Sequence, residues 1–422
     1  FPYHIYSKLN LAFLYYKLNQ LKKAELIVDE AIKIKPDMAN CYCIKGLISK
    51  GLEKYIESES LLRKAIEINP IYFDAYINLG LLFKDKGEYI EAEDFYIKAT
   101  KIEPNSSIAN LNLGACYKEL KIIEKAIFHT ELALKIDSRI ENGNLNLATI
   151  YYEKGDYNKA FLLAKKELLI NKENEVAYQL ISELLKHLIL ENSIEKRKVL
   201  KDLFNRKDIS HREIFNNTRN LLENKILKKL SIEKYNLFYS KEFKLLLKDN
   251  EIIQSLKLMI FCDPLWEKVL RNIREKTLYG YSENKKIDKE IFKFLIALGM
   301  QCFLNEYVYY VNPQEADKLE ELIKSINQNK ITEDKLVLIS CYQSLYSISK
   351  ENEYLKNYTS KNKELNELIN IQLKDRLREK EISCKINKLG NISDAISKKV
   401  KNQYESNPYP RWRYNSYAIK QK

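Results

Sequence analysis

Prolines recur at a fixed interval in the first part of the chain. Pro2, Pro36, Pro70 and Pro104 are each separated by 34 residues, and Ser138 continues the interval after the proline is lost. A period of this length is typical of solenoids, in which stacked supersecondary units bury one continuous core. The interval divides this part of the chain into five units, at residues 5–38, 39–72, 73–106, 107–140 and 141–174.

Small side chains recur at the same interval inside each unit. One series is Ala12, Gly46, Gly80, Gly114 and Ala148; a second is Ala24, Ser58, Ala92, Ala126 and Ala160; a third, Ala31, Ala65, Ala99 and Ala133, is broken by Glu167. Small residues let two helices approach closely, so each unit is predicted to be a helical hairpin. The pattern resembles the tetratricopeptide repeat (TPR), and residues 79–104 are close to its consensus. The resemblance implies a right-handed solenoid of hairpins, residues 1–174, with a concave face that binds protein or peptide.

Composition favours helix through the rest of the chain as well. The 422 residues include only 10 glycines and 8 prolines, and 45% are hydrophobic, which is enough to fold. The period fails at Glu167 and Lys172, where the array is expected to end. Residues 175–204 are predicted to form a capping helix, spanning about 175–201, and a linker. Residues 205–392 are predicted to form an irregular helical domain. Its expected helices include 264–276, 289–310 and 313–327, with Asp263 and Asn312 as N-caps before Pro264 and Pro313.

Asparagines form a further series with the same period. Asn10, Asn78, Asn112 and Asn146 occupy the sixth position of the first helix of their units, where the second unit has Ile44. The TPR resemblance places this position on the concave face, where a carboxamide can both donate to and accept from a peptide backbone. Tyr6, Phe13 and Leu81 are expected on the same face. The alternative is that asparagine is simply abundant in this chain and solvates the inner wall.

The C-terminal segment carries a second resemblance. Residues 393–405 are predicted to form a helix that runs into the decapeptide Gln-Tyr-Glu-Ser-Asn-Pro-Tyr-Pro-Arg-Trp at 403–412, where two prolines stop it. This decapeptide resembles the hinge of bacterial proteins that join a TPR array to a class I methyltransferase domain. Residues 263–265 and 302–308 resemble the middle helical region of the same proteins. The resemblance implies that 393–422 leads to a domain that binds S-adenosylmethionine and is absent from this chain, which we expect to be a piece of a longer protein.

No catalytic site is evident in these residues, and no cofactor is expected to bind them. The four histidines lie far apart, and no glycine-rich phosphate loop occurs. Glu306, expected on a buried helix, is the one carboxylate that could serve a site in the middle domain, although a structural role is favoured. The alternatives to a TPR scaffold for a methyltransferase are therefore an enzyme site around Glu306 and the TPR arm of a peptide O-glycosyltransferase.

Charge and cysteine content exclude other classes of function. The net charge is +13, but residues 1–174 hold 25 Lys and Arg against 24 Asp and Glu, and no basic stripe is interleaved with aromatic residues. A nucleic-acid partner is therefore not expected. No apolar run is long enough for a membrane helix. The seven cysteines are scattered as buried residues of a reducing compartment would be, and Cys41 and Cys43 do not have zinc-site spacing. We expect a cytoplasmic protein that binds no metal.

Overall fold

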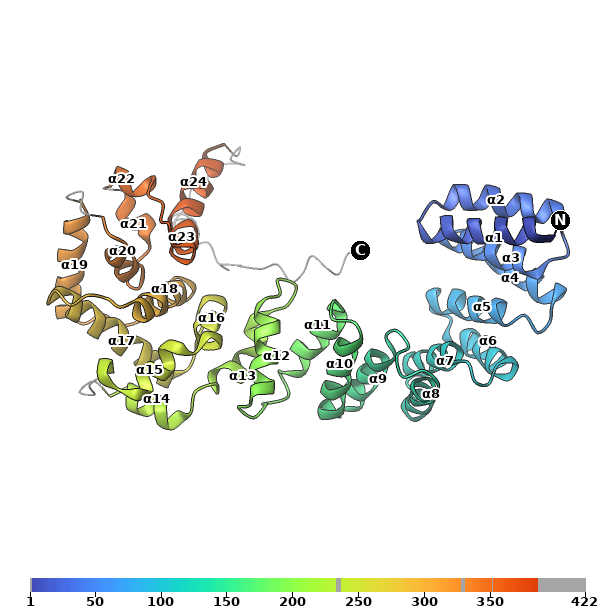
Figure 1. Ribbon diagram of the computed structural model, residues 1–422, viewed down its shortest axis with the longest axis horizontal. Coiled ribbons are helices and arrows are strands. Elements are labelled where there is room, and N and C mark those ends of the chain that lie inside the picture. The colour runs from blue at the N-terminus through green and yellow to red at the C-terminus, as the bar shows by residue number, and fades with distance from the viewer. Residues whose placement is uncertain (1, 233–236, 328–330, 351, 386–422) are drawn as a thin grey trace, which may run out of the picture. The chain divides into compact units, whose positions relative to one another are not determined.

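The computed structural model describes residues 2–232, 237–327, 331–350 and 352–385 of the chain (Figure 1). Within these residues every regular element is a helix, so the all-α prediction is confirmed. The chain divides into two compact units, Phe1–Leu184 and Leu185–Lys422.

The first unit consists of five helical hairpins and a final helix. In chain order its helices are α1 (Pro2–Lys17), α2 (Leu21–Ile34), α3 (Ala39–Gly51), α4 (Tyr55–Ile68), α5 (Phe73–Asp85), α6 (Tyr89–Ile102), α7 (Ser107–Glu119), α8 (Ile123–Ile136), α9 (Gly143–Lys154), α10 (Tyr157–Ile170) and α11 (Glu175–Leu184). We call the odd-numbered helices of this unit the A helices and the even-numbered ones the B helices. From α3 onward, each A helix packs against both helices of the preceding hairpin. The predicted solenoid of hairpins is therefore present.

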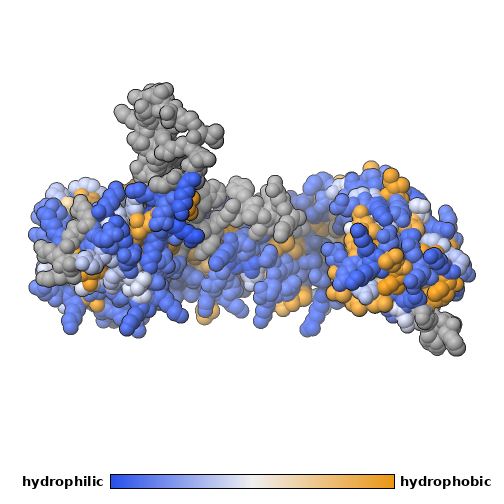
Figure 2. All heavy atoms as spheres, turned by 90° about the horizontal axis from the view of Figure 1, so that it is seen from above, coloured by the Kyte–Doolittle hydropathy of each residue, from blue (hydrophilic) through white to orange (hydrophobic). Residues whose placement is uncertain are grey.

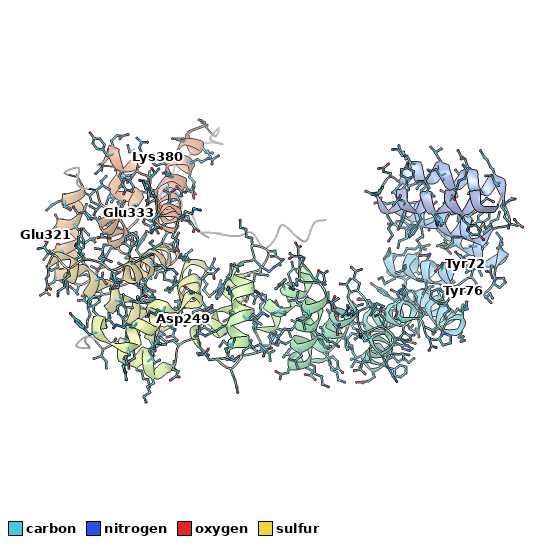
Figure 3. All side chains as sticks on the ribbon, viewed as in Figure 1. Tyr72, Tyr76, Asp249, Glu321, Glu333 and Lys380 are labelled. Carbon is cyan, nitrogen blue, oxygen red and sulfur yellow. The ribbon has the colours of Figure 1, made fainter. Side chains whose placement is uncertain are left out.

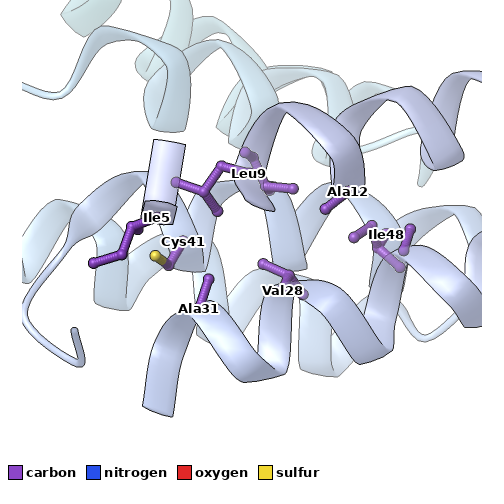
Figure 4. Packing of buried hydrophobic residues seen from close by; sticks show 9 residues of the cluster. Ile5, Leu9, Ala12, Val28, Ala31, Cys41 and Ile48 are labelled. Carbon is purple, nitrogen blue, oxygen red and sulfur yellow. The ribbon is translucent and has the colours of Figure 1, made fainter. Parts of the chain in front are cut away.

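Small residues account for the close packing within each hairpin. A Cβ atom added to Gly80 in α5 would lie 2.4 Å from a ring carbon of Tyr96 in α6. A Cβ on Gly114 would lie 2.3 Å from the hydroxyl oxygen of Thr130. Figure 4 shows the core between the first two hairpins, where Ile48 of α3 packs among residues of α1 and α2 that include Ala12 and Val28. The three series of small residues are thus explained by helix packing.

The repeated prolines are held by a hydrogen bond that also repeats. The hydroxyl of Tyr42 donates to the carbonyl of Pro36, six residues earlier, at 2.9 Å. Tyr76, which is labelled in Figure 3, does the same to Pro70. In the fourth hairpin the amide of Asn110 donates to the carbonyl of Pro104 at 3.3 Å. Each bond fixes the turn that leads into an A helix, because proline stops the preceding helix and the bond satisfies its carbonyl.

The fifth hairpin departs from this pattern at its start. α9 begins at Gly143, the third residue of its repeat, whereas α3, α5 and α7 begin at the first. The cause is Glu167, which stands where the other hairpins have alanine and is fully buried. Its carboxylate accepts from the backbone N–H groups of Asn142 and Leu145 at 3.2 and 3.3 Å. Glu167 therefore caps α9 from the neighbouring helix, and Asn142 takes a left-handed conformation at φ 60°.

The second unit is an irregular helical domain. Its α-helices are α12 (Ile194–Phe204), α13 (Phe215–Arg219), α14 (Asn224–Leu230), α15 (Lys241–Lys248), α16 (Asn250–Leu258), α17 (Pro264–Ser282), α18 (Lys289–Leu304), α19 (Pro313–Asn327), α20 (Glu333–Ser340), α21 (Leu345–Ser349), α22 (Glu353–Lys356), α23 (Lys363–Ile369) and α24 (Asp375–Lys385). Short 3-10 helices occur at His211–Ile214 and Leu237–Tyr239, and a π-helix at Asn370–Lys374 joins α23 to α24.

The single helix expected over about 175–201 is not formed, because α11 ends at Leu184 and α12 begins only at Ile194. The buried side chain of Asn217 satisfies the backbone between them. It accepts from the N–H of Leu190 at 2.8 Å and donates to the carbonyls of Leu185 and Leu188. These bonds satisfy the backbone of this non-helical segment in place of helical ones.

The expected N-caps of two helices are confirmed. Asp263 accepts from the backbone N–H groups of Leu265 and Trp266 at the start of α17. Asn312 accepts from the N–H of Glu315 at 2.8 Å, and Glu315 accepts in return from the N–H of Asn312 at 3.3 Å. This reciprocal arrangement is a capping box at the start of α19. Elsewhere in the unit, Asp249, which is labelled in Figure 3, caps α16. It also forms an ion pair with Arg197 at 2.8 Å.

A buried ionic cluster connects α17, α19 and the segment after α20. The guanidinium of Arg274 donates to a carboxylate oxygen of Glu315 at 3.2 Å, and the two side chains are only 2% and 4% exposed. Arg274 also donates to the carbonyl of Tyr310 at 2.8 Å and lies 4.1 Å from the ring centroid of Tyr342. The Tyr342 hydroxyl donates to Glu315 at 2.6 Å. Burial raises the pKa of Tyr342 well above its ordinary value, so the phenol stays protonated and remains a donor.

Candidate peptide-binding face

The A helices of the first unit present one continuous surface. Consecutive A helices contact one another along the unit, so residues at the same repeat position form rows across them. Counting each repeat from residues 5, 39, 73, 107 and 141, positions 2, 6, 9 and 12 lie close to one another on each A helix. We call the surface made by these positions the A face. It contains every residue that the sequence predicted for peptide binding.

The asparagine row at position 6 divides into free and engaged side chains. Asn10 is exposed, and Asn112 and Asn146 are half-buried. Across the described part of the chain no hydrogen bond involves these three carboxamides. Asn78 differs, because its amide donates to the sulfur of Cys43 on the preceding A helix at 3.3 Å. Asn10, Asn112 and Asn146 can therefore form hydrogen bonds with a peptide backbone, as the sequence predicted. Asn78 would first have to break its bond to Cys43.

The first A helix makes its part of the A face aromatic. Tyr6 and Phe13 are exposed, and the Phe13 ring stacks with that of Tyr16 at a centroid distance of 6.1 Å. The ammonium of Lys17 lies 5.4 Å from the centroid of the Phe13 ring. Leu81, at position 9 of the third repeat, is half-buried. The A face thus changes from aromatic on α1 to polar on α9, where positions 6 and 9 are Asn146 and Thr149.

Sequence reasoning missed a row of lysines at position 12. Lys50, Lys84 and Lys118 lie one turn beyond position 9 on α3, α5 and α7. The ammonium of Lys50 pairs with Asp85 at 2.6 Å, and that of Lys118 with Glu119 at 2.9 Å. No ion pair involves Lys84 in the described residues. The row could have been recognised in the sequence, because its lysines are also 34 residues apart. Lys84 gives the middle of the A face one positive charge that has no ion-pair partner among the described residues.

Cys43, which is buried beside the A face and bonded to Asn78, is the neighbouring side chain that could be considered a nucleophile. Burial raises the pKa of its thiol to about 12, and the bond from Asn78 opposes this only in part. A thiol with this pKa carries almost no thiolate near neutral pH and is a poor nucleophile. Cys43 therefore serves to hold Asn78 in place rather than as a nucleophile.

The prediction of a buried helical carboxylate at Glu306 is wrong. α18 ends at Leu304, and Glu306 follows it as an exposed residue with φ 60°. The helix stops because Glu306 and Tyr307 both adopt left-handed conformations, while the side chain of Asn305 accepts from the N–H of Tyr307 at 3.1 Å. Glu306 is therefore an exposed turn residue and not the buried helical carboxylate that the sequence predicted.

Other kinds of site find no support in the residues that the structure describes. They contain no group of three or more His, Cys, Asp or Glu side chains that could hold a metal ion. None of their helices is long and apolar enough to cross a membrane. A depression of about 640 Å³ beside Tyr55, Ile56 and Leu61 is open to solvent. The predicted helix and hinge at 393–422 lie outside the described residues.

Comparison with known families agrees with the geometry of the first unit. Models described as tetratricopeptide repeat match residues 5–38, 39–72 and 61–94. The first unit contains tetratricopeptide repeats. The first two matched segments coincide with the first two units deduced from the proline interval. No curated protein sequence matches the chain.

Several solved structures have a similar fold. PilF of Pseudomonas aeruginosa is 18% identical, with a TM-score of 0.42, covering 47% of this chain and 88% of PilF. TTC0263, a thermophilic TPR protein of Thermus thermophilus, is 18% identical, with a TM-score of 0.39 and coverages of 43% and 98%. PilW, a type IV pilus biogenesis factor, is 19% identical, with a TM-score of 0.40 and coverages of 58% and 98%.

Proposed function

We propose that the first unit is a scaffold that binds an extended peptide segment of a partner protein on its A face. The observation that carries the proposal is the row of carboxamides at Asn10, Asn112 and Asn146, which are accessible and have no hydrogen-bond partner among the described residues. A carboxamide that offers both a donor and an acceptor can hold a peptide unit whatever its side chain. The row therefore favours recognition of the main chain.

The dimensions of the A face suit an extended peptide. Packed helices lie about 8–10 Å apart, so the A helices of five hairpins span about 40 Å. An extended chain advances about 3.3 Å per residue, and a segment of about 12–15 residues would cover the row. Neighbouring carboxamides would then meet peptide units about three residues apart. The aromatic residues on α1 favour an apolar residue at one end of the peptide, and Lys84 favours an acidic residue near its middle.

The experiment uses fluorescence anisotropy to measure how tightly the chain binds a labelled pool of random peptides of about 15 residues. Replacing Asn78, Asn112 and Asn146 together with alanine is expected to abolish binding without changing the unfolding midpoint. Single variants should differ, with Asn112→Ala and Asn146→Ala weakening binding more than Asn78→Ala, because Asn78 is already bonded to Cys43. Asn158→Ala, at an exposed position of α10, is the control. Unchanged binding by the triple variant would refute the proposal.

We further propose that the scaffold belongs to a methyltransferase that uses S-adenosylmethionine. The support is the decapeptide at 403–412, which resembles the hinge between a TPR array and a class I methyltransferase domain. In this proposal residues 1–174 bind the partner, 175–204 cap the array, 205–392 position the catalytic domain and 393–422 lead to it. The arm of a peptide O-glycosyltransferase is the alternative, which the hinge does not favour.

This second proposal has a genetic and a biochemical test. A strand followed by a glycine-rich loop, encoded shortly after Lys422, would support the methyltransferase, and a stop codon there would refute it. Calorimetry of this chain with S-adenosylmethionine should give no binding heat, because the cofactor site is placed in the further domain. A clear binding isotherm would instead place a cofactor site in the present residues.

A further inference from the structure

The positive charge of the chain is concentrated in one part of the second unit. Residues 194–248 hold 15 Lys and Arg against 7 Asp and Glu. By contrast, residues 1–184 hold 25 against 26, and residues 249–385 hold 22 against 22. The rest of the excess lies in residues 386–422, outside the described part of the chain. A uniform bias in composition would spread the charge evenly, so the excess in 194–248 is a local feature of the second unit.

Six lysines of this segment form a surface on two helices that pack together. The members are all exposed, and they are Lys225, Lys228 and Lys229 on α14 and Lys241, Lys244 and Lys248 on α15. Spacings of three or four residues place each set of three on one side of its helix. The ammonium of Lys229 pairs with Glu242 of α15 at 2.6 Å, so the two sides lie next to each other (Figure 1). We call these six lysines the basic surface.

Most of the charge on the basic surface is not compensated. Among the described residues, no ion pair involves the two lysines of α14 other than Lys229, or Lys241 and Lys244 of α15. Lys248 lies 4.0 Å from Glu290, and both of these side chains are more than half exposed. The three lysines of α15 span about 10 Å, which is comparable with the Debye length at about 0.1 M salt. Their charges therefore act together on a nearby anion.

Large side chains with apolar character are exposed beside these lysines. Leu245 is 57% exposed on the same side of α15 as Lys244 and Lys248. Tyr239, directly before the cap of α15, is 83% exposed, and Ile232, two residues after α14, is 52% exposed. In Figure 2 the second unit, at the left of the view, presents a largely hydrophilic surface with scattered hydrophobic side chains. The combination of lysines with exposed leucine, isoleucine and tyrosine is therefore unlike an ordinary solvated face.

We infer that the basic surface docks the second unit onto an anionic lipid bilayer. The lysines attract the negatively charged headgroups, and each contributes to the free energy of binding only close to the membrane. Leu245 and Ile232 enter the boundary between headgroups and acyl chains, and Tyr239 suits the same depth because its ring is apolar and its hydroxyl polar. The inference concerns the second unit alone and does not depend on peptide binding by the A face.

Other polyanions match the surface less well. Single-stranded nucleic acid stacks its bases on successive aromatic side chains, and Tyr239 is the one exposed aromatic residue in the described part of 224–248. An acidic peptide would pair with the lysines but would leave apolar side chains on two helices in water. A bilayer offers anionic groups and an apolar layer over one broad surface, so it satisfies both features.

The experiment measures sedimentation of the full chain with lipid vesicles. One set contains phosphatidylcholine alone, and the other contains phosphatidylcholine and phosphatidylserine at about 2:1. At about 0.1 M salt the chain should sediment with the second set and not with the first, and about 1 M salt should release it. Equal sedimentation with both sets, or sedimentation with neither, would overturn the inference.

Matched lysine substitutions locate the surface that binds. Each lysine near an anionic membrane changes the binding constant about fivefold, so replacing Lys241, Lys244 and Lys248 together with glutamine should weaken binding about 100-fold. The control makes the same change in charge at exposed lysines of the first unit, where no excess of positive charge occurs, and consists of Lys101→Gln, Lys135→Gln and Lys166→Gln. The control should bind as the unchanged chain does. Equal weakening by the two triple variants would overturn the inference.

A tryptophan in place of Leu245 tests insertion directly. In a Trp412→Phe background, the emission of Leu245→Trp should shift to shorter wavelength when vesicles with phosphatidylserine are added. Leu26→Trp is the control, because Leu26 is 68% exposed in the first unit, and its emission should not shift. Binding without a shift at position 245 would overturn the proposed insertion. Binding of polyglutamate or of a single-stranded oligonucleotide, lost in the α15 triple variant, by a chain that does not bind vesicles would overturn the proposed partner.

Discussion

Replacing Glu315 by glutamine should destabilise the second unit strongly. The change leaves the guanidinium of Arg274 buried without a counter-charge, since Glu315 is its one carboxylate partner among the described ion pairs and both side chains are almost completely buried. Removing one member of a buried ion pair typically costs about 3–5 kcal/mol. With a urea m-value of about 2 kcal/mol/M, the unfolding midpoint should fall by about 1.5–2.5 M.

Tryptophan fluorescence can report on this unit alone. The chain has two tryptophans, and Trp266 is completely buried in α17, the helix that carries Arg274. A Trp412→Phe background therefore makes Trp266 the only reporter. The control is Glu320→Gln, on the same helix as Glu315, because Glu320 pairs with Lys324 at a surface where both side chains are more than half exposed. This control should change the free energy of unfolding by less than about 0.5 kcal/mol.

The comparison of the two glutamine variants decides whether the cluster stabilises the unit. Similar midpoints for Glu315→Gln and Glu320→Gln would refute the reasoning. A double variant, Arg274→Met with Glu315→Leu, provides a further check, because an apolar pair of similar size removes the unpaired charge. It should recover only part of the stability that Glu315→Gln loses, because the Tyr342 hydroxyl and the Tyr310 carbonyl then lose their buried partners.

Three further predictions concern packing, capping and thiol reactivity. Gly80→Ala should destabilise the first unit by about 1–3 kcal/mol in urea unfolding, because the new Cβ would lie 2.4 Å from the Tyr96 ring. Gly280→Ala is the control. The nearest atom to a Cβ at Gly280 is 3.7 Å away, so this substitution should be neutral or stabilising. Glu167→Ala should cost about 1–2 kcal/mol and speed hydrogen exchange at Asn142 and Leu145, and unchanged exchange there would contradict its role as a cap. In a Cys384→Ser background, only the exposed Cys262 should react with a thiol reagent in the native state. Burial raises the pKa of Cys43 and Cys302 to about 12, so raising the pH to about 9 should not expose a second reactive thiol.

The repeat register could be deduced from the sequence because each repeated position meets the same neighbours. Gly80 and Gly114 face large or branched side chains of their own hairpins, and the matched family segments agree with the first units. The late start of α9 could not be deduced, because it depends on Glu167, which lies 24 residues after Gly143 and reaches back across the hairpin.

The second unit shows why helix boundaries outside the repeats were harder to predict. The segment 185–193 has a helical composition but is held in a non-helical conformation by hydrogen bonds from Asn217, which is distant in sequence. The expected helix 289–310 ends at Leu304, because Asn305 and two left-handed residues form a turn that composition does not reveal. On the A face, the asparagine row was visible in the sequence, but the bond between Asn78 and Cys43 depends on the packing of adjacent repeats.

The most direct test of the central claim is to locate a bound peptide on the first unit. A photoreactive phenylalanine analogue can be placed at Ala115, which lies at position 9 of the A face, or at Asn158, an exposed residue of the B helix α10. After irradiation with the labelled peptide pool, we expect crosslinks from position 115 and none from position 158. Crosslinks from position 158 alone, or from neither position while binding is retained, would contradict the assignment of peptide binding to the A face.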